Sequence, residues 1–483
     1  MTDSLKKTLW TLIVFQIIFW TMVPLLAHHA PPLDATEMYS WSLSFEWGYY
    51  KHPPMPAWIV GILQMLIGKN MLSLFLPASL SIAASYYCVA WLASRMLPEK
   101  SAIIALLLYA LVIYCHLWST DFNHNQIQMP FWALSLVFLY MTLERGSLTY
   151  SFFLGVVMGL NALSKYTAAL IVPCALLLLM VSPDWRRTFN LKMIAFATLG
   201  FLIIFSPHIY WLFQNDFLPF RYLGGRFDQL STESNPYLSL IDYILNICVA
   251  HALMILLALV VLIKPRSQEN SSIKITQAHR DFIWIMGFGP VLITLLMGIF
   301  GVQLYSRWVT PMLPMISIWF VYLLGTRLDG LYSKKGLALF IVIELILGTV
   351  YIYKNKFNES QSSRGHFPAP EISAQIYNQW HQLYPQAPFK IVSGSEWEAS
   401  FVSFFSPEKT YAYTEADSKL APWVSLTDVN ACGMVMMSPT SAQLKQFPQA
   451  QIQQPIKIST KNNQASVNVS WALLPPAGIC QLK

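Results

Sequence analysis

Charged residues are scarce in this chain of 483 residues. Lys and Arg number 31 and Asp and Glu number 24, which together make 11% of the sequence, whereas soluble domains carry about 25%. Apolar residues make up 55% of the chain. A compact soluble body could not hide that much apolar surface, so the composition excludes a soluble enzyme and predicts a polytopic membrane protein.

Several sequence motifs are missing as well. The chain has no Walker-type phosphate loop, no CxxC metal pattern, no GxSxG elbow, no HExxH pair and no internal repeat. Energy coupling to nucleotide hydrolysis therefore has no support in this chain. The formal net charge is +7, but Lys and Arg are spread between apolar runs, so we expect no nucleic-acid partner.

Apolar runs fill the first 350 residues and predict about eleven transmembrane helices. The runs cover residues 9–27, 71–94, 102–118, 127–143, 151–163, 167–182, 193–213, 239–263, 282–302, 309–326 and 336–353. The first run ends in His28-His29-Ala30, not in a small-residue cleavage site, so we expect a retained span. The run at 54–67 is too short to cross and predicts a helix lying in the membrane interface.

The distribution of basic residues predicts the topology. With a cytoplasmic N-terminus, most Lys and Arg of the membrane region fall on the inside, as the positive-inside rule requires. An odd number of spans then places the C-terminus outside, which in a bacterial inner membrane is the periplasm. The exceptions on the outer face are Lys51, Lys69, Lys165, Arg221, Arg226 and Arg307. These six cations need a separate explanation.

The composition changes at Asn355, where no further run is long enough to span. We therefore expect a transmembrane domain over 1–354 and a periplasmic α/β domain over 355–483. Short β-like runs at 390–392, 410–413, 433–437 and 465–471 alternate with helical stretches near 371–383, 396–405 and 440–446. Cys432 and Cys480 are the only cysteines of this tail, and outside the cytoplasm they are expected to form a disulfide.

Acidic and aromatic residues gather in the first outside loop. Asp34 and Glu37 stand three residues apart, so a helix starting here would carry both carboxylates on one face, beside Tyr39 and Trp41. The alternative is a helix N-terminus in which Asp34 is the cap and Glu37 supports it. Both interpretations remain open at this point.

The same loop resembles a known pattern. Asp34 opens a helix after the first span, and Gly-Tyr-Tyr-Lys-His-Pro-Pro follows at 48–54. This is similar to the GT-C glycosyltransferases of the protein O-mannosyltransferase and lipid A aminoarabinose transferase type. Further matching stretches lie at 119–123 (Ser-Thr-Asp-Phe-Asn), 163–167 (Leu-Ser-Lys-Tyr-Thr) and 306–308 (Ser-Arg-Trp). The resemblance implies a multi-span enzyme that takes a sugar from a polyprenyl-phosphate carrier on the outer face of the membrane.

Two departures from the family pattern limit what carries over. Ala35 follows Asp34 where the family has an adjacent Asp-Glu pair, so the role of the second acid does not transfer to Glu37. Lys51-His52 stands where aminoarabinose transferases have Glu-Lys before Pro-Pro. The catalytic carboxylate is therefore expected at Asp34, while the donor sugar and the acceptor stay open.

The residue chemistry gives each candidate a role. Asp34 would take the proton from an acceptor hydroxyl, and Asp121 would orient the sugar or act as a second carboxylate. Cations placed against the departing phosphate lower the barrier. The expected substrate-binding residues are Glu37, Tyr39, Tyr50, Lys51, His52, Asn123, His124, Lys165, Tyr166, Arg221, Arg226 and Arg307. Attraction to anionic lipid headgroups is the alternative for Arg221 and Arg226, and a solvated turn is the alternative for Asp121.

No cofactor is required by this scheme. His52 and Glu37 offer ligands for a divalent cation, but no spacing compels one, and a structural histidine is the simpler interpretation. Displacement by one hydroxyl with a single base predicts inversion at the anomeric carbon. Asp242 and Glu344 fall inside predicted spans and are further suspects, because acids are costly there.

The predicted function is an integral-membrane glycosyltransferase that moves a sugar from an undecaprenyl-phosphate type donor to a lipid such as lipid A, a glycan or a protein. Membrane lipids surround the chain. The alternative is a transporter or flippase of lipid-linked sugars. A transporter places charges and broken helices near the bilayer midplane in paired halves, whereas here they cluster in the loops of one face, which favours the enzyme.

Overall fold

The computed structural model describes residues 1–233, 236–263, 273–300, 302, 305–357, 364–459 and 466–482. Contacts divide the chain into two compact units. We call the first the helical unit; it comprises Met1–Met22, Lys51–Met55 and Leu76–Thr349. The second, the α/β unit, comprises Val23–Tyr50, Pro56–Phe75 and Val350–Lys483. A linear division at residue 354 would place the two early segments with the spans, whereas their contacts group them with the C-terminal residues.

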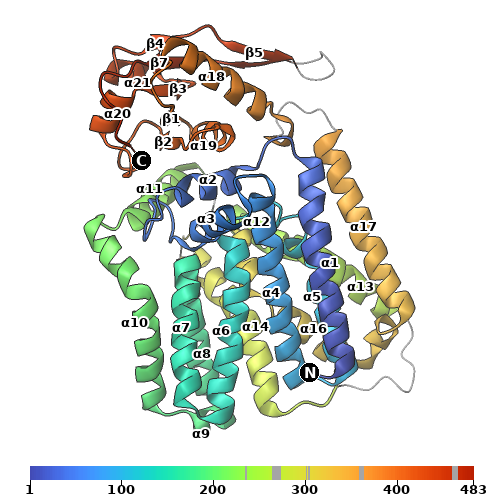
Figure 1. Cartoon of the computed structure of the whole chain (residues 1–483). Helices are drawn as coiled ribbons and strands as arrows, with labels where there is room; N and C mark the ends of the chain where they lie inside the picture. The colour runs from blue at the N-terminus through green and yellow to red at the C-terminus, as the bar shows by residue number, and fades with distance from the viewer. Residues whose placement is uncertain are drawn as a thin grey trace. The chain divides into compact units, whose positions relative to one another are not determined.

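Helices form almost all of the helical unit (Figure 1). They are α1 (Asp3–Ala27), α4 (Leu72–Met96), α5 (Glu99–Ala110), α6 (His124–Arg145), α7 (Leu148–Ser164), α8 (Ile171–Val181), α9 (Pro183–Thr188), α10 (Leu191–Gln214), α11 (Leu218–Glu233), α12 (Pro236–Ala250), α13 (Ala252–Ile263), α14 (Gln277–Ile299), α15 (Ser306–Val309), α16 (Ile316–Leu324) and α17 (Lys334–Lys356). Short 3-10 turns are η1 (Ile113–Cys115), η2 (Tyr166–Leu170), η3 (Thr310–Met312) and η4 (Gly325–Leu331).

Among the described residues, six helices are long and apolar enough to cross a membrane: α1, α4, α6, α10, α14 and α17. The other apolar runs form shorter helices, so the expected count of eleven spans is not confirmed. The run at 239–263, for example, is divided at His251 into α12 and α13. The mainly helical, multi-pass character of the chain is confirmed, because long apolar helices are the form in which a backbone crosses lipid with its hydrogen bonds satisfied.

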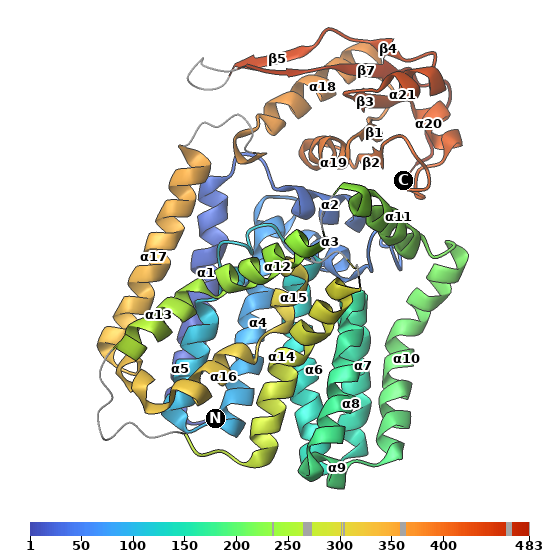
Figure 2. The same ribbon diagram turned by 180° about the vertical axis from the view of Figure 1, so that it is seen from behind.

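Glycine allows α7 and α10 to pack closely, and both views show the two helices side by side (Figures 1 and 2). A Cβ atom at Gly155 would lie 1.8 Å from the carbonyl oxygen of Ala197, and one at Gly200 would lie 2.2 Å from that of Phe152. Gly155 and Gly159 are spaced as in the small-residue motif of membrane helix pairs. The two backbones meet where these side chains are missing.

One buried acid joins α1 to α17. Glu344 is 1% exposed, and the indole N–H of Trp20 donates a hydrogen bond of 2.8 Å to its carboxylate. Phe15 and Phe340 meet on the same pair of helices, with ring centroids 6.4 Å apart. Glu344 therefore has a structural partner. The other suspect, Asp242, is exposed on α12.

The α/β unit contains helices α2 (Leu33–Ser42), α3 (Met55–Ile67), α18 (Ala369–Leu383), α19 (Glu396–Phe405), α20 (Leu426–Cys432) and α21 (Ser441–Gln446), and the 3-10 turn η5 (Arg364–His366). Its strands are β1 (Ile391–Gly394), β2 (Tyr411–Thr414), β3 (Met434–Met437), β4 (Gln451–Ile452), β5 (Ile456–Ser459), β6 (Ser466–Val469) and β7 (Trp471–Leu474). Five strands pair in the order β2-β1-β3-β7-β4, and β5 pairs with β6. The first two contacts, β2-β1 and β1-β3, are parallel and the others antiparallel.

Alternating strand residues cover both faces of this sheet. Val435 and Met437 join the core made with α18 and α19, whereas Met434 and Met436 join the core made with α20. Successive side chains of a strand point to opposite faces, so strands buried on both sides must be apolar throughout. The continuous run Met-Val-Met-Met of β3 meets that requirement.

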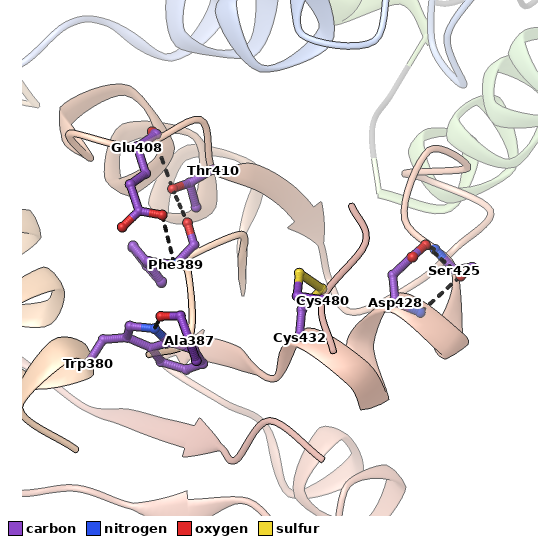
Figure 3. The surroundings of a disulfide bond; sticks show 9 residues. All are labelled: Trp380, Ala387, Phe389, Glu408, Thr410, Ser425, Asp428, Cys432 and Cys480. Carbon is purple, nitrogen blue, oxygen red and sulfur yellow. Dashed lines mark hydrogen bonds between the residues drawn. A yellow bond between two sulfur atoms is a disulfide. The ribbon is translucent and has the colours of Figure 1, made fainter. Parts of the chain in front are cut away.

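Cys432 and Cys480 are joined by a disulfide, with Cα atoms 4.4 Å apart, which ties the last residues of the chain to the end of α20 (Figure 3). Ser425 and Asp428 cap the start of the same helix. Across the domain, the Glu408 carboxylate accepts the backbone N–H of Phe389 at 3.0 Å. These bonds fix the loops around the sheet.

Candidate functional site

Asp34 lies in the first turn of α2, half-buried, and Glu37 lies one turn later at 5% exposure. The N-cap position is occupied by Pro32, whose side chain makes no cap hydrogen bond. The interpretation of Asp34 as the cap is therefore wrong. A carboxylate in the first turn still lies at the positive end of the helix dipole.

The aromatic residues of the same segment are held inside the α/β unit. Tyr39 is 1% exposed and its hydroxyl donates to the backbone carbonyl of Ser403 at 3.2 Å. The Tyr50 hydroxyl donates to the Glu396 carboxylate at 2.7 Å. Burial raises the pKa of Tyr39 well above its usual value, so this phenol stays neutral and acts as a donor.

Lys165 is a buried cation of the helical unit. It stands where α7 ends and η2 begins, with extended backbone angles, and is 7% exposed. Its ammonium donates a hydrogen bond of 2.6 Å to Asn125 and lies 5.4 Å from the centre of the Trp308 ring. A buried ammonium is costly unless partners hold it, so this lysine is a strong functional candidate.

Two histidine rings lie close together, tilted by 40°, beside the start of α6. The rings of His52 and His124 lie 4.0 Å apart, and His124 Nε2 lies 3.2 Å from the carbonyl oxygen of Pro53. Asn123 caps α6 by accepting the N–H of Asn125 at 2.8 Å, in a capping box with Gln126. The start of α6 thereby holds the 51–55 segment, and Asn123 has a structural role in addition to any contact with substrate.

Tyr166 follows Lys165 directly and points its hydroxyl at His208 of α10, 2.9 Å from Nε2. Its ring stacks on Phe220 with centroids 4.9 Å apart. Asp121 is half-buried shortly before α6. Through His208 and Phe220, Tyr166 connects the break between α7 and α8 to α10 and α11.

Of the three predicted arginines, the described structure places only the side chain of Arg221. The Arg221 side chain is 66% exposed and pairs with Asp216 at 3.7 Å, which fits the alternative of lipid headgroup attraction. The side chains of Arg226 in α11 and Arg307 in α15 lie outside the described residues.

The predicted site residues fall in both units. Asp34, Glu37, Tyr39 and Tyr50 belong to the α/β unit. Those of the helical unit are Lys51, His52, Asp121, Asn123, His124, Lys165, Tyr166, Arg221, Arg226 and Arg307. Within the described residues, no group of three or more His, Cys, Asp or Glu side chains is arranged to hold a metal ion.

Sequence reasoning missed several partners. Asn125 and Trp308 hold Lys165, and His208 holds Tyr166, but none of the three is among the expected site residues. Trp308 lies within the quoted Ser-Arg-Trp stretch, which was a usable signal. Nothing in the sequence pointed to Glu396 or Ser403, which lie more than 340 residues after their partners.

Comparison with known proteins agrees with this fold. A family model described as dolichyl-phosphate-mannose-protein mannosyltransferase matches residues 51–211. The lipopolysaccharide core galacturonosyltransferase RgtA of Rhizobium johnstonii is 26% identical over 212 residues, which is 43% of this chain and 42% of RgtA. The lipopolysaccharide core galacturonosyltransferase RgtB of the same organism is 23% identical, covering 72% of this chain and 71% of RgtB. The chain thus spans less than half the length of RgtA.

A solved structure extends the match over nearly the whole chain. ArnT from Cupriavidus metallidurans, crystallised with undecaprenyl phosphate, superimposes with a TM-score of 0.56 over 96% of this chain and 97% of ArnT, at 14% identity. At that identity the likeness shows a shared fold. The family match over residues 51–211, the relatives and the shared fold all make this chain similar to GT-C membrane glycosyltransferases of the protein mannosyltransferase and ArnT type.

Proposed function

We propose that this protein transfers a sugar from a polyprenyl-phosphate carrier, of the undecaprenyl-phosphate type, to a lipid or glycan acceptor at the outer face of a bacterial inner membrane. The buried Lys165 carries this proposal. Its ammonium is held by Asn125 and Trp308 at a break between helices, where a phosphate group would meet a fixed positive charge. The match of residues 51–211 to the mannosyltransferase family includes this lysine.

The reaction needs one proton acceptor. An acceptor hydroxyl attacks the anomeric carbon, its proton passes to the Asp34 carboxylate, and the bond between the anomeric carbon and the phosphate oxygen breaks. Polyprenyl phosphate leaves with the bonding electrons, and Lys165 stabilises the charge that it gains. Attack from the face opposite the phosphate inverts the anomeric configuration.

The relatives indicate the acceptor class. RgtA and RgtB act, by their names, on the lipopolysaccharide core, and ArnT was crystallised with undecaprenyl phosphate. We therefore propose lipid A or the lipopolysaccharide core as the acceptor. The disulfide between Cys432 and Cys480 supports a periplasmic position for the C-terminal domain, because disulfides persist in oxidising compartments.

The test is sugar transfer by the purified protein in liposomes, with undecaprenyl-phosphate sugars and lipopolysaccharide. Asp34→Asn keeps the size of the side chain and removes the base, so we expect turnover to fall about 10²- to 10⁴-fold while donor binding is retained. Asp3→Asn, at the exposed start of α1, is the matched control. Full turnover by Asp34→Asn would exclude this base, and movement of lipid-linked sugar across the bilayer without transfer would favour a transporter.

A further inference from the structure

One helix of the C-terminal domain holds the segment that carries Asp34. We call residues 29–50 the α2 segment; it lies in the same compact unit as α19, and Figure 1 shows the two helices next to each other. Ala30 of the segment joins the core formed with α18 and α19, and Leu43 packs against the core on the other face of the sheet. The segment is therefore an integral part of the α/β unit.

The first contact fixes the entrance to α2. The indole N–H of Trp397 donates to the carbonyl of Pro31 at 3.3 Å, one residue before the N-cap. The Trp397 ring contacts the rings of Phe367 and Phe401, with centroid distances of 4.8 and 5.0 Å. The position of the first turn, which contains Asp34, is thus set from α19.

The second contact fixes the middle of α2. The Tyr39 hydroxyl donates to the backbone carbonyl of Ser403, and its ring meets Phe404 edge-on with centroids 5.1 Å apart. A backbone carbonyl moves only with its helix. Tyr39 therefore fixes the position of α2 against the C-terminal end of α19.

The third contact fixes the exit of the segment. The Tyr50 hydroxyl donates to one oxygen of Glu396 at 2.7 Å, and the other oxygen accepts from the Thr414 hydroxyl at 3.4 Å. Glu396 is thereby tied to the end of β2. At 2.7 Å, the bond from Tyr50 to Glu396 is the shortest of the three hydrogen bonds that join the α2 segment to α19.

We propose that α19 is the positioning element of the α2 segment, and that Glu396 acts through Tyr50 as a positioning residue for Asp34. This inference rests on the proposed function. One partner, α19, contacts the segment before, within and after its ten-residue helix, which leaves the helix few ways to shift. Small displacements of a base cost rate steeply, because proton transfer needs the base within hydrogen-bond reach of the acceptor.

The test combines kinetics with hydrogen exchange on the full-length protein in detergent. Glu396→Ala and Tyr50→Phe should each lower kcat roughly tenfold to hundredfold with little change in the donor KM. The double variant should be no slower than either single one, because both changes break the same contact. Backbone amides of α2 should exchange faster in each variant. Glu396→Gln keeps an acceptor oxygen and should restore part of the rate.

A matched control separates positioning from stability. Asp428→Ala removes the carboxylate that accepts the backbone N–H and the hydroxyl of Ser425, the N-cap residue of α20 in the same domain (Figure 3). It does not touch the α2 segment, so it should lower the unfolding temperature and leave kcat and α2 exchange unchanged. Unchanged kcat and unchanged α2 exchange in Glu396→Ala would overturn the inference. If the wild type transfers no sugar at all, the proposed function fails, and the exchange data alone decide whether α19 holds the segment.

Discussion

Lys165 is the most informative single residue, because burying an ammonium group in a membrane protein costs free energy. Lys165→Met keeps the length of the side chain and removes the charge. We expect kcat/KM for the donor to fall about 10²- to 10³-fold, because the departing phosphate loses its counter-charge. Lys192→Met, an exposed residue of α10, is the control and should retain activity. Equal activity of the two variants in the transfer assay would contradict the role of Lys165.

His28 should make the stability of the protein depend on pH. Burial lowers its pKa to about 4 from an ordinary value of 6.5, and its Nε2 lies 2.6 Å from the Tyr351 hydroxyl. The unfolded chain therefore takes up a proton on His28 at a higher pH than the folded chain does. Stability should fall as the pH drops from about 6.5 to about 4, and this histidine adds no further loss below that.

The measurement is the thermal unfolding temperature in detergent between pH 4 and 8, for wild type and His28→Gln. The variant should be less stable at pH 8 but lose less stability on acidification. Parallel curves for the two proteins would show that His28 does not take part.

At the scale of single residues, the sequence predicts which residues are candidates better than it predicts which side chains contact them. Asp34 and Lys165 stand out because their types are unusual for their places in the chain, and local spacing suffices to notice them. Asn125 and Glu396 are ordinary residues whose importance comes from contacts made by the folded chain. Local sequence contains no information of that kind.

Close packing of α7 and α10 gives a prediction about helices. Gly155→Ala would bring a methyl group to within 1.8 Å of the Ala197 carbonyl oxygen, so the helices must separate. We expect a loss of stability of about 1–3 kcal/mol, seen as a lower unfolding temperature in detergent. Gly225→Ala is the control: no atom of the described residues would lie within 4 Å of a Cβ atom added at that position in α11, and alanine favours a helix. If Gly155→Ala lowered the unfolding temperature less than Gly225→Ala did, the close packing of α7 against α10 would be refuted.

Elements were predicted well where periodicity or length was decisive. The interfacial helix expected at 54–67 matches α3, and the β-like runs at 390–392, 410–413 and 433–437 match β1, β2 and β3 within two residues at each end. The division of the run 239–263 was missed because hydropathy measures apolar character and does not mark where a helix ends. Strands β4 and β5 lie outside the expected runs because β4 has only two residues, both exposed, and β5 alternates isoleucine with polar residues over only four positions.

The whole chain is multi-pass, and its disulfide offers a test of orientation. If the C-terminal domain faces the periplasm, Cys432 and Cys480 should resist alkylation in intact cells until a reductant is added. Replacing both with serine should lower the stability of this domain by about 2–4 kcal/mol, measured by limited proteolysis at increasing urea. Free thiols at both positions in protein taken directly from cells would place the domain in the cytoplasm.

Pairing Tyr39 with Ser403 joins residues 364 positions apart. Ribosomes add about 5–20 residues per second, so α2 exists for roughly 20–70 s before its partner helix is made. The sheet of the α/β unit is complete only after β7 is made, because this last strand pairs between β3 and β4. Each newly made molecule therefore begins with its Asp34 helix unsupported, and a nonsense mutation shortly before Trp471 would leave it in that state permanently.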